Sequence, residues 1–129
     1  MKKHKKLLAC VGLENSRTKI RHFSKGMLQR LALAQALLGN PQILILDEPC
    51  AGLDAMGRVE MLELIRCLKE DGKTILMNSH ILSDMERVCD EGIILKDGKI
   101  MRTFTKEELK EPGTLEKLFL DVVREGSVD

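Results

Sequence analysis

The feature that most constrains the fold is an apolar run that ends in two carboxylates and a proline, Ile43-Leu44-Ile45-Leu46-Asp47-Glu48-Pro49. Consecutive large aliphatic residues, rich in β-branching, suit a strand that is buried on both faces, as in a parallel sheet. Asp47 and Glu48 then fall at the carboxyl end of the strand, where open α/β sheets place their ligands. Two acids at that position suggest a metal ligand and a base. Pro49 ends the strand because it has no N–H to donate.

Composition narrows the range of partners. The 129 residues are one domain or part of one, and 21 basic against 20 acidic side chains give a net charge of +1. A net charge so close to zero gives no long-range electrostatic attraction to nucleic acid or to an anionic membrane. The chain has no Trp, no Tyr and only 3 Phe, so aromatic platforms for single-stranded nucleic acid are not expected either. We predict no nucleic-acid partner.

The cysteines give no sign of a metal site. Cys10, Cys50, Cys67 and Cys89 are scattered, without a CxxC pair or a histidine at ligand spacing. They are interpreted as reduced thiols, each acting as a small buried hydrophobe. No apolar run approaches the roughly 20 residues that a membrane-spanning helix needs.

Apolar runs alternate along the chain with segments whose apolar residues have helical spacing. Ser24 is an N-cap candidate for a helix that ends at Gly39-Asn40-Pro41. The Asp97-Gly98 pair between two apolar runs predicts a β-hairpin. This order of elements indicates α/β architecture with a parallel pair of strands at its centre. The expected elements are helices over 2–13, 25–38, 59–70 and 83–89, strands over 43–46 and 74–78, a hairpin of 92–96 with 99–103, and two short helices within 106–124 whose Leu115, Leu118, Phe119 and Val122 share one face.

Four motifs carry a family resemblance. Residues 23–30, Phe-Ser-Lys-Gly-Met-Leu-Gln-Arg, resemble the signature motif of ATP-binding cassette (ABC) ATPases, and residues 43–49 resemble their Walker B strand. Ala51-Gly52-Leu53-Asp54 resembles the D-loop, and Asn78-Ser79-His80 resembles the switch-histidine loop. The resemblance implies a P-loop NTPase-like parallel sheet flanked by helices, with a C-terminal β-hairpin. It corresponds to the carboxyl-terminal half of one nucleotide-binding domain.

The resemblance also implies an internal organisation. Residues 1–40 would belong to the helical subdomain with the signature motif, 41–104 to the core with the Walker B, D-loop and switch-histidine motifs, and 105–129 to C-terminal helices. Lys25-Gly26-Met27 in place of Gly-Gly-Gln is similar to the variant found in bacterial ABC exporters that have a separate ATPase subunit.

Catalytic roles follow from the resemblance. Asp47 would help to hold Mg²⁺ beside the β- and γ-phosphates of ATP, and Glu48 would act as base or orient the attacking water. His80 would contact the γ-phosphate. Taken alone, His80 would be interpreted as a loop histidine satisfied by hydrogen bonds, and only its position after the second strand points to catalysis.

The signature residues Ser24, Lys25, Gly26 and Met27 stand at a helix start, where free N–H groups and the helix dipole attract phosphate. In the family this motif touches the γ-phosphate of ATP held by a second nucleotide-binding domain, and Asp54 would lie at the same interface. Ser24 could equally be an N-cap alone, and Lys25 a solvated lysine. Gln29 and Arg30 match the family pattern, but a position on the helix surface explains them as well.

One family motif is absent from the sequence. No G-x-x-x-x-G-K-[ST] phosphate loop occurs among the 10 glycines. We expect this chain alone to bind ATP weakly or not at all and to be inactive by itself, because that loop supplies most phosphate contacts. The strand at 74–78 should also have an unpaired edge, which invites pairing with another chain. We therefore expect full folding only with an amino-terminal half-domain, supplied by another chain or by a longer reading frame.

The predicted function is an ATP-binding and ATP-hydrolysing subunit of an ABC transporter that drives export. Its partners would be a membrane-spanning transporter subunit and a second nucleotide-binding domain, and it would lie in the cytoplasm on the inner face of the cell membrane. Two alternatives stay open: a non-catalytic half-domain or truncated product that only completes a partner's ATP site, and a soluble ABC ATPase of translation or DNA repair. The neutral charge and the exporter-like signature favour the transporter over the latter.

Overall fold

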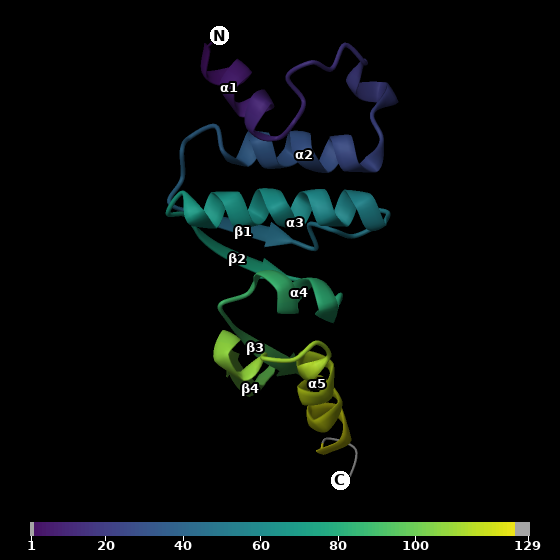
Figure 1. The fold of residues 1–129 in the computed structure, drawn as a ribbon, viewed down its shortest axis with the longest axis vertical. Coiled ribbons are helices and arrows are strands. Elements are labelled where there is room, and N and C mark those ends of the chain that lie inside the picture. The colour runs from purple at the N-terminus through teal and green to yellow at the C-terminus, as the bar shows by residue number, and fades with distance from the viewer. Residues whose placement is uncertain (1, 126–129) are drawn as a thin grey trace. The chain divides into compact units, whose positions relative to one another are not determined.

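A computed structural model describes residues 2–125 of the chain (Figure 1). The chain divides into two compact units, one up to Asn78 and the other from Ser79.

The first unit alternates helices and strands as the sequence predicts. Its elements are α1 (Lys2–Cys10), the 3₁₀ helix η1 (Ile20–His22), α2 (Lys25–Ala36), β1 (Ile43–Asp47), α3 (Ala55–Glu70) and β2 (Thr74–Asn78). Helix α3 begins four residues earlier than its apolar spacing indicated, because the Asp54 side chain caps it by accepting a hydrogen bond from the Gly57 N–H. The Ser24 cap of α2 is confirmed.

Strands β1 and β2 form a parallel pair. The register runs from Ile43 opposite Thr74 to Asp47 opposite Asn78, so both strands end level at their carboxyl ends. At the opposite end the Lys73 ammonium donates to the Asn40 side-chain oxygen at 3.0 Å and to the Pro41 carbonyl at 2.6 Å. The pair is therefore tied at both ends.

The core of the first unit lies on one face of this sheet. Leu44 of β1 is buried, as are residues from α2 and α3, and α3 runs beside the strands in Figure 1. Apolar residues at helical spacing form the buried stripe of α3: Met61, Leu62, Ile65 and Leu68.

The opposite face of the sheet is exposed, so the prediction that β1 is buried on both faces is wrong for the described residues. Ile45 is 75% exposed, and Ile43 and Leu76 are 63% and 64% exposed. The reason is that burial alternates along β1, with Leu44 on the covered face and Ile43 and Ile45 on the other, and that the sheet has two strands within residues 2–125. In the same residues β2 pairs with β1 alone, which confirms its predicted unpaired edge.

The second unit is a hairpin packed against two helices. Its elements are α4 (Leu82–Val88), β3 (Glu91–Lys96), β4 (Lys99–Thr105), the 3₁₀ helix η2 (Lys106–Glu108) and α5 (Thr114–Glu125). The Asp97-Gly98 turn has positive φ at both residues, as a tight hairpin requires. The predicted first tail helix is only this 3₁₀ turn, whereas the second is confirmed as α5.

The core of the second unit joins the hairpin to α5. Ile94 and Phe104 pack with Leu115 and Val122, and Leu118 lies against this cluster. Phe119, predicted on the same face, is 37% exposed. It lies about 40° around the helix from Leu115, on the side away from Leu118, and so stands at the margin of the buried face.

The cysteines differ from one another in burial. Cys50 is buried and Cys89 half-buried, but Cys10 and Cys67 are exposed, so the expectation of burial was wrong for these two. Both exposed thiols lie on helices, where one face is left to solvent. Within residues 2–125, none of the helices combines the length and the apolar character needed to cross a membrane.

Candidate functional site

The predicted catalytic carboxylates lie where β1 delivers them, at the carboxyl edge of the parallel pair. The Asp47 side chain is exposed, whereas Glu48 is half-buried and its Oε2 atom is shielded from solvent. An exposed carboxylate beside a shielded one suits two different roles, a cation ligand and a base.

The backbone at Glu48 adopts an unusual conformation. Its φ is +48°, in the left-handed region, which a glutamate rarely enters. Its N–H donates to the Asn78 carbonyl at 3.1 Å and to the Asn78 side-chain oxygen at 2.9 Å. Sequence reasoning assigned Asn78 to the histidine loop but missed this contact, which joins residues 30 positions apart and leaves no local signal.

A second group of predicted residues gathers where α2 and α3 begin. All five residues expected at a nucleotide, Ser24, Lys25, Gly26, Met27 and Asp54, line one hollow of about 370 Å³. Ser24 Oγ accepts from the Met27 N–H at 3.2 Å, and Asp54 Oδ1 accepts from the Gly57 N–H at 2.7 Å. Both helices thus present their N-terminal dipole ends to this hollow, an arrangement that favours an anion.

Contacts across the hollow join the signature segment to the D-loop. The Lys25 side chain lies over Gly52, whose φ is +75°: a Cβ on Gly52 would lie 2.7 Å from Lys25 Nζ. Arg30 of α2 forms an ion pair with Glu60 of α3, and its side chain is only 21% exposed. Arg30 therefore has a specific partner at the hollow and is more than a surface residue. The sequence offered no signal for the Glu60 contact.

His80 belongs to the second unit, so it is not among the residues that the first unit brings together. It stands at the tip of a turn in which Ser79 Oγ accepts a hydrogen bond from the Ile81 N–H at 3.0 Å. The His80 side chain is exposed. This turn fixes the backbone on both sides of the histidine.

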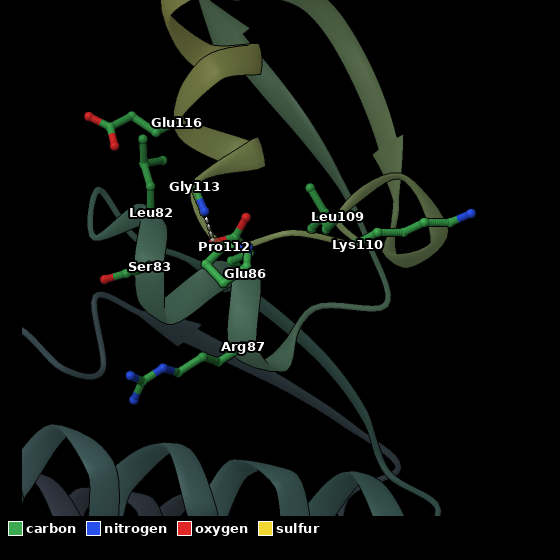
Figure 2. A pocket seen from close by; sticks show the side chains of 9 residues that line it. All are labelled: Leu82, Ser83, Glu86, Arg87, Leu109, Lys110, Pro112, Gly113 and Glu116. Carbon is green, nitrogen blue, oxygen red and sulfur yellow. Dashed lines mark hydrogen bonds between the residues drawn. The ribbon is translucent and has the colours of Figure 1, made fainter.

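The second unit has its own hollow, of about 430 Å³, between α4, residues 109–113 and α5 (Figure 2). None of the predicted site residues lines it. The Glu86 carboxylate accepts from the Gly113 N–H and the Leu115 N–H, each at 3.1 Å. Figure 2 shows Glu86 pointing at the start of α5, where it serves as a cap. This hollow is therefore assigned a structural role.

The described residues supply few side-chain ligands for a metal ion. Among residues 2–125 no three His, Cys, Asp or Glu side chains lie close enough to form a metal site by themselves. Mg²⁺ commonly takes only one or two protein carboxylates and completes its shell with phosphate oxygens and water. A single exposed carboxylate at Asp47 fits such an ion.

Known proteins of similar sequence are ATP-binding proteins of ABC transporters. A family profile described as "ABC transporter" matches residues 2–51. The chain is 47% identical over 106 residues to an uncharacterized ABC transporter ATP-binding protein of Nostoc sp. PCC 7120, an alignment that covers 80% of this chain and 32% of the relative. It is 42% identical over 114 residues to the lantibiotic transport ATP-binding protein SrtF of Streptococcus pyogenes, covering 88% of this chain and 48% of SrtF.

Solved structures give the same result for the fold. CbiO1 of Clostridium perfringens, part of the ABC transporter complex CbiONQ, superposes with a TM-score of 0.78 at 31% identity, over 97% of this chain and 51% of CbiO1. The dimeric bacterial ABC transporter cassette MJ0796 superposes with a TM-score of 0.71 at 32% identity, over 81% of this chain and 46% of the cassette. The chain therefore matches ATP-binding cassette proteins of ABC transporters in sequence and in fold. It spans between a third and half of the length of these relatives.

Proposed function

We propose that this chain supplies the signature, Walker B and D-loop portion of an ATPase that powers export through an ABC transporter. The observation that carries the proposal is the hollow at the starts of α2 and α3, which collects all five residues expected at a nucleotide. Two helix N-termini and a serine hydroxyl at one hollow suit the terminal phosphate of ATP.

In this proposal the strand-end carboxylates act on the phosphate side of the reaction. Asp47 would be a ligand of Mg²⁺, which neutralises charge on the β- and γ-phosphates when bound. Glu48 would orient the attacking water and accept its proton, and His80 would donate a hydrogen bond to the γ-phosphate. The half-buried position of Glu48, with its Oε2 atom shielded from solvent, suits a residue that orients a water molecule.

The hollow at the starts of α2 and α3, named the signature hollow from here on, would act across a dimer. Ser24, Lys25, Gly26 and Met27 would contact a γ-phosphate held by a second nucleotide-binding domain, with Asp54 at the same interface. The dimeric form of one structural relative supports this arrangement.

A phosphate-loop half-domain would complete the sheet. The exposed apolar face of Ile43, Ile45 and Leu76, together with the open edge of β2, is a surface that a further strand and helix would bury. A membrane-spanning subunit would complete the transporter and hold the ATPase at the cytoplasmic face of the membrane. The lantibiotic transport relative supports a role in transport.

Reconstitution tests this function. The chain is co-expressed with the amino-terminal half of a homologous nucleotide-binding domain, and ATP hydrolysis is measured for the complex and for the chain alone. We expect hydrolysis by the complex, none by the chain alone, and a loss of at least about 10²-fold in the complex with Glu48→Gln. The control is Glu107→Gln, which alters an exposed glutamate of η2. Hydrolysis that survives Glu48→Gln would refute the catalytic assignment.

A second candidate is a non-catalytic module that only completes a partner's ATP site. It is favoured by one observation: the signature hollow is built, although no phosphate-loop motif is present in the sequence. In that case the chain would stimulate hydrolysis by an intact homologous domain, Ser24→Arg would abolish the stimulation, and Glu48→Gln would not.

A further inference from the structure

We propose that Asn78 is a positioning residue for Glu48, holding the backbone of that residue in the conformation that aims its carboxylate. This inference rests on the proposed function for its catalytic consequence, and on the geometry of β1 and β2 for its structural part.

The contact depends on the register of the parallel pair. Asn78 is the last residue of β2 and lies opposite Asp47, so Glu48 is the first residue beyond the paired segment of β1. The Glu48 N–H donates to two acceptors of this one residue, the carbonyl at 3.1 Å and the side-chain Oδ1 at 2.9 Å. The side-chain contact is therefore added to an ordinary ladder bond, and only the side-chain contact depends on residue type.

The conformation at Glu48 explains why a second acceptor matters. A glutamate at φ +48° is held against its intrinsic preference, and such backbones persist only where the surroundings fix them. Pro49 follows directly, and the proline ring disfavours the ordinary helical conformation at the residue before it, Glu48. Pro49 itself is buried. Without Oδ1 of Asn78, rotation of the Glu48 peptide towards negative φ would swing the carboxylate away from the sheet edge.

Amide exchange in the full chain tests the structural part without any catalysis. With a ¹⁵N-labelled chain, we expect Asn78→Leu, which has a similar volume but no acceptor, to speed exchange of the Glu48 amide about 10-fold. Asn78→Asp keeps an acceptor at the same place and should preserve the protection. Amides within the ladder, such as that of Leu46, serve as internal controls. Equal exchange of the Glu48 amide in all three proteins would overturn the proposal.

The catalytic part is measured in the complex with a phosphate-loop half-domain. Asn78→Leu should lower kcat about 10²-fold with an unchanged KM, because a misplaced base affects chemistry more than binding. Asn78→Asp should recover most of the rate. Similar losses in both variants, with loss of ladder protection, would assign Asn78 a purely structural role. Hydrolysis that resists Glu48→Gln would refute the proposed function while leaving the exchange result intact.

Discussion

The ring of Phe104 lies across Gly92, its register partner in the hairpin of β3 and β4. A Cβ on Gly92 would lie 2.3 Å from Cζ of that ring and 2.7 Å from Cε1. Phe104 is buried and packs with Ile94, Leu115 and Val122. Gly92 is therefore required by the core of the second unit, since only a residue without a side chain leaves room for the ring.

Gly92→Ala should loosen this core. The added methyl group forces Phe104 out of its position, and overpacking of this kind destabilises by about 1–3 kcal/mol. Amide exchange of β3 and β4 measures the effect within the second unit. Gly39→Ala is the control, because no atom lies within 4 Å of a Cβ at that position and Gly39 is not a positive-φ glycine. Equal protection of the hairpin in the two variants would show that Phe104 adjusts without loss.

Asp54 should show two separable roles. Its Oδ1 caps α3 through the Gly57 N–H, and its place at the signature hollow suggests a contact with a second domain. Asp54→Ala should lower the free energy of unfolding by about 1 kcal/mol, whereas Asp54→Asn keeps the acceptor and should change it little. Urea unfolding, followed by circular dichroism, measures both variants.

If Asp54 also acts at an interface, the two variants should affect ATP hydrolysis differently from the way they affect stability. In the complex with a phosphate-loop half-domain, both Asp54→Asn and Asp54→Ala should reduce ATP hydrolysis, because both remove the charge. If Asp54→Asn hydrolyses ATP at the parent rate, Asp54 is a helix cap alone.

Local signals in the sequence predicted the elements of this fold well. Ser24 as a cap and Asp97-Gly98 as a turn follow from neighbouring residues, and the parallel pair of 43–46 with 74–78 follows from the order of the elements; all are confirmed. The early start of α3 was missed because its first turn, from Ala55 to Arg58, carries no apolar stripe.

Contacts between distant residues could not be predicted in the same way. The exposure of Ile45 depends on what covers the sheet. The same apolar run is compatible with a covered outer face and with an open one. The contact of Asn78 with Glu48 and the ion pair of Arg30 with Glu60 depend on register and helix packing, which no local pattern encodes. The sequence therefore predicted where the carboxylates lie, but it did not predict what holds them.

Glu86 should determine how firmly α5 begins. Its carboxylate accepts hydrogen bonds from the N–H groups of Gly113 and Leu115. At a helix start, such donors otherwise bond to water. Glu86→Ala should lower the stability of the second unit by about 0.5–2 kcal/mol, the range found for lost caps. Amide exchange of Leu115 reports the change. Glu116→Ala is the matched control, since Glu116 lies in the first turn of α5 and is exposed; equal losses would assign the effect to general helix electrostatics.

The Cys67 thiol on the outer face of α3 should alkylate slowly. Partial desolvation and the nearby carboxylates of Glu63, Glu70 and Asp71 raise its pKa above the ordinary value for a cysteine. The reactive species is the thiolate, so a raised pKa leaves less of it at pH 8 and moves the rise in rate to higher pH. Iodoacetamide labelling, followed by peptide mass spectrometry, should therefore modify Cys67 more slowly than a cysteine in an unfolded peptide.

Neutralising two of the acids, with Glu63→Gln and Glu70→Gln, should speed labelling of Cys67, whereas Glu107→Gln in η2 should not. An unchanged labelling rate in the double variant would leave desolvation as the cause.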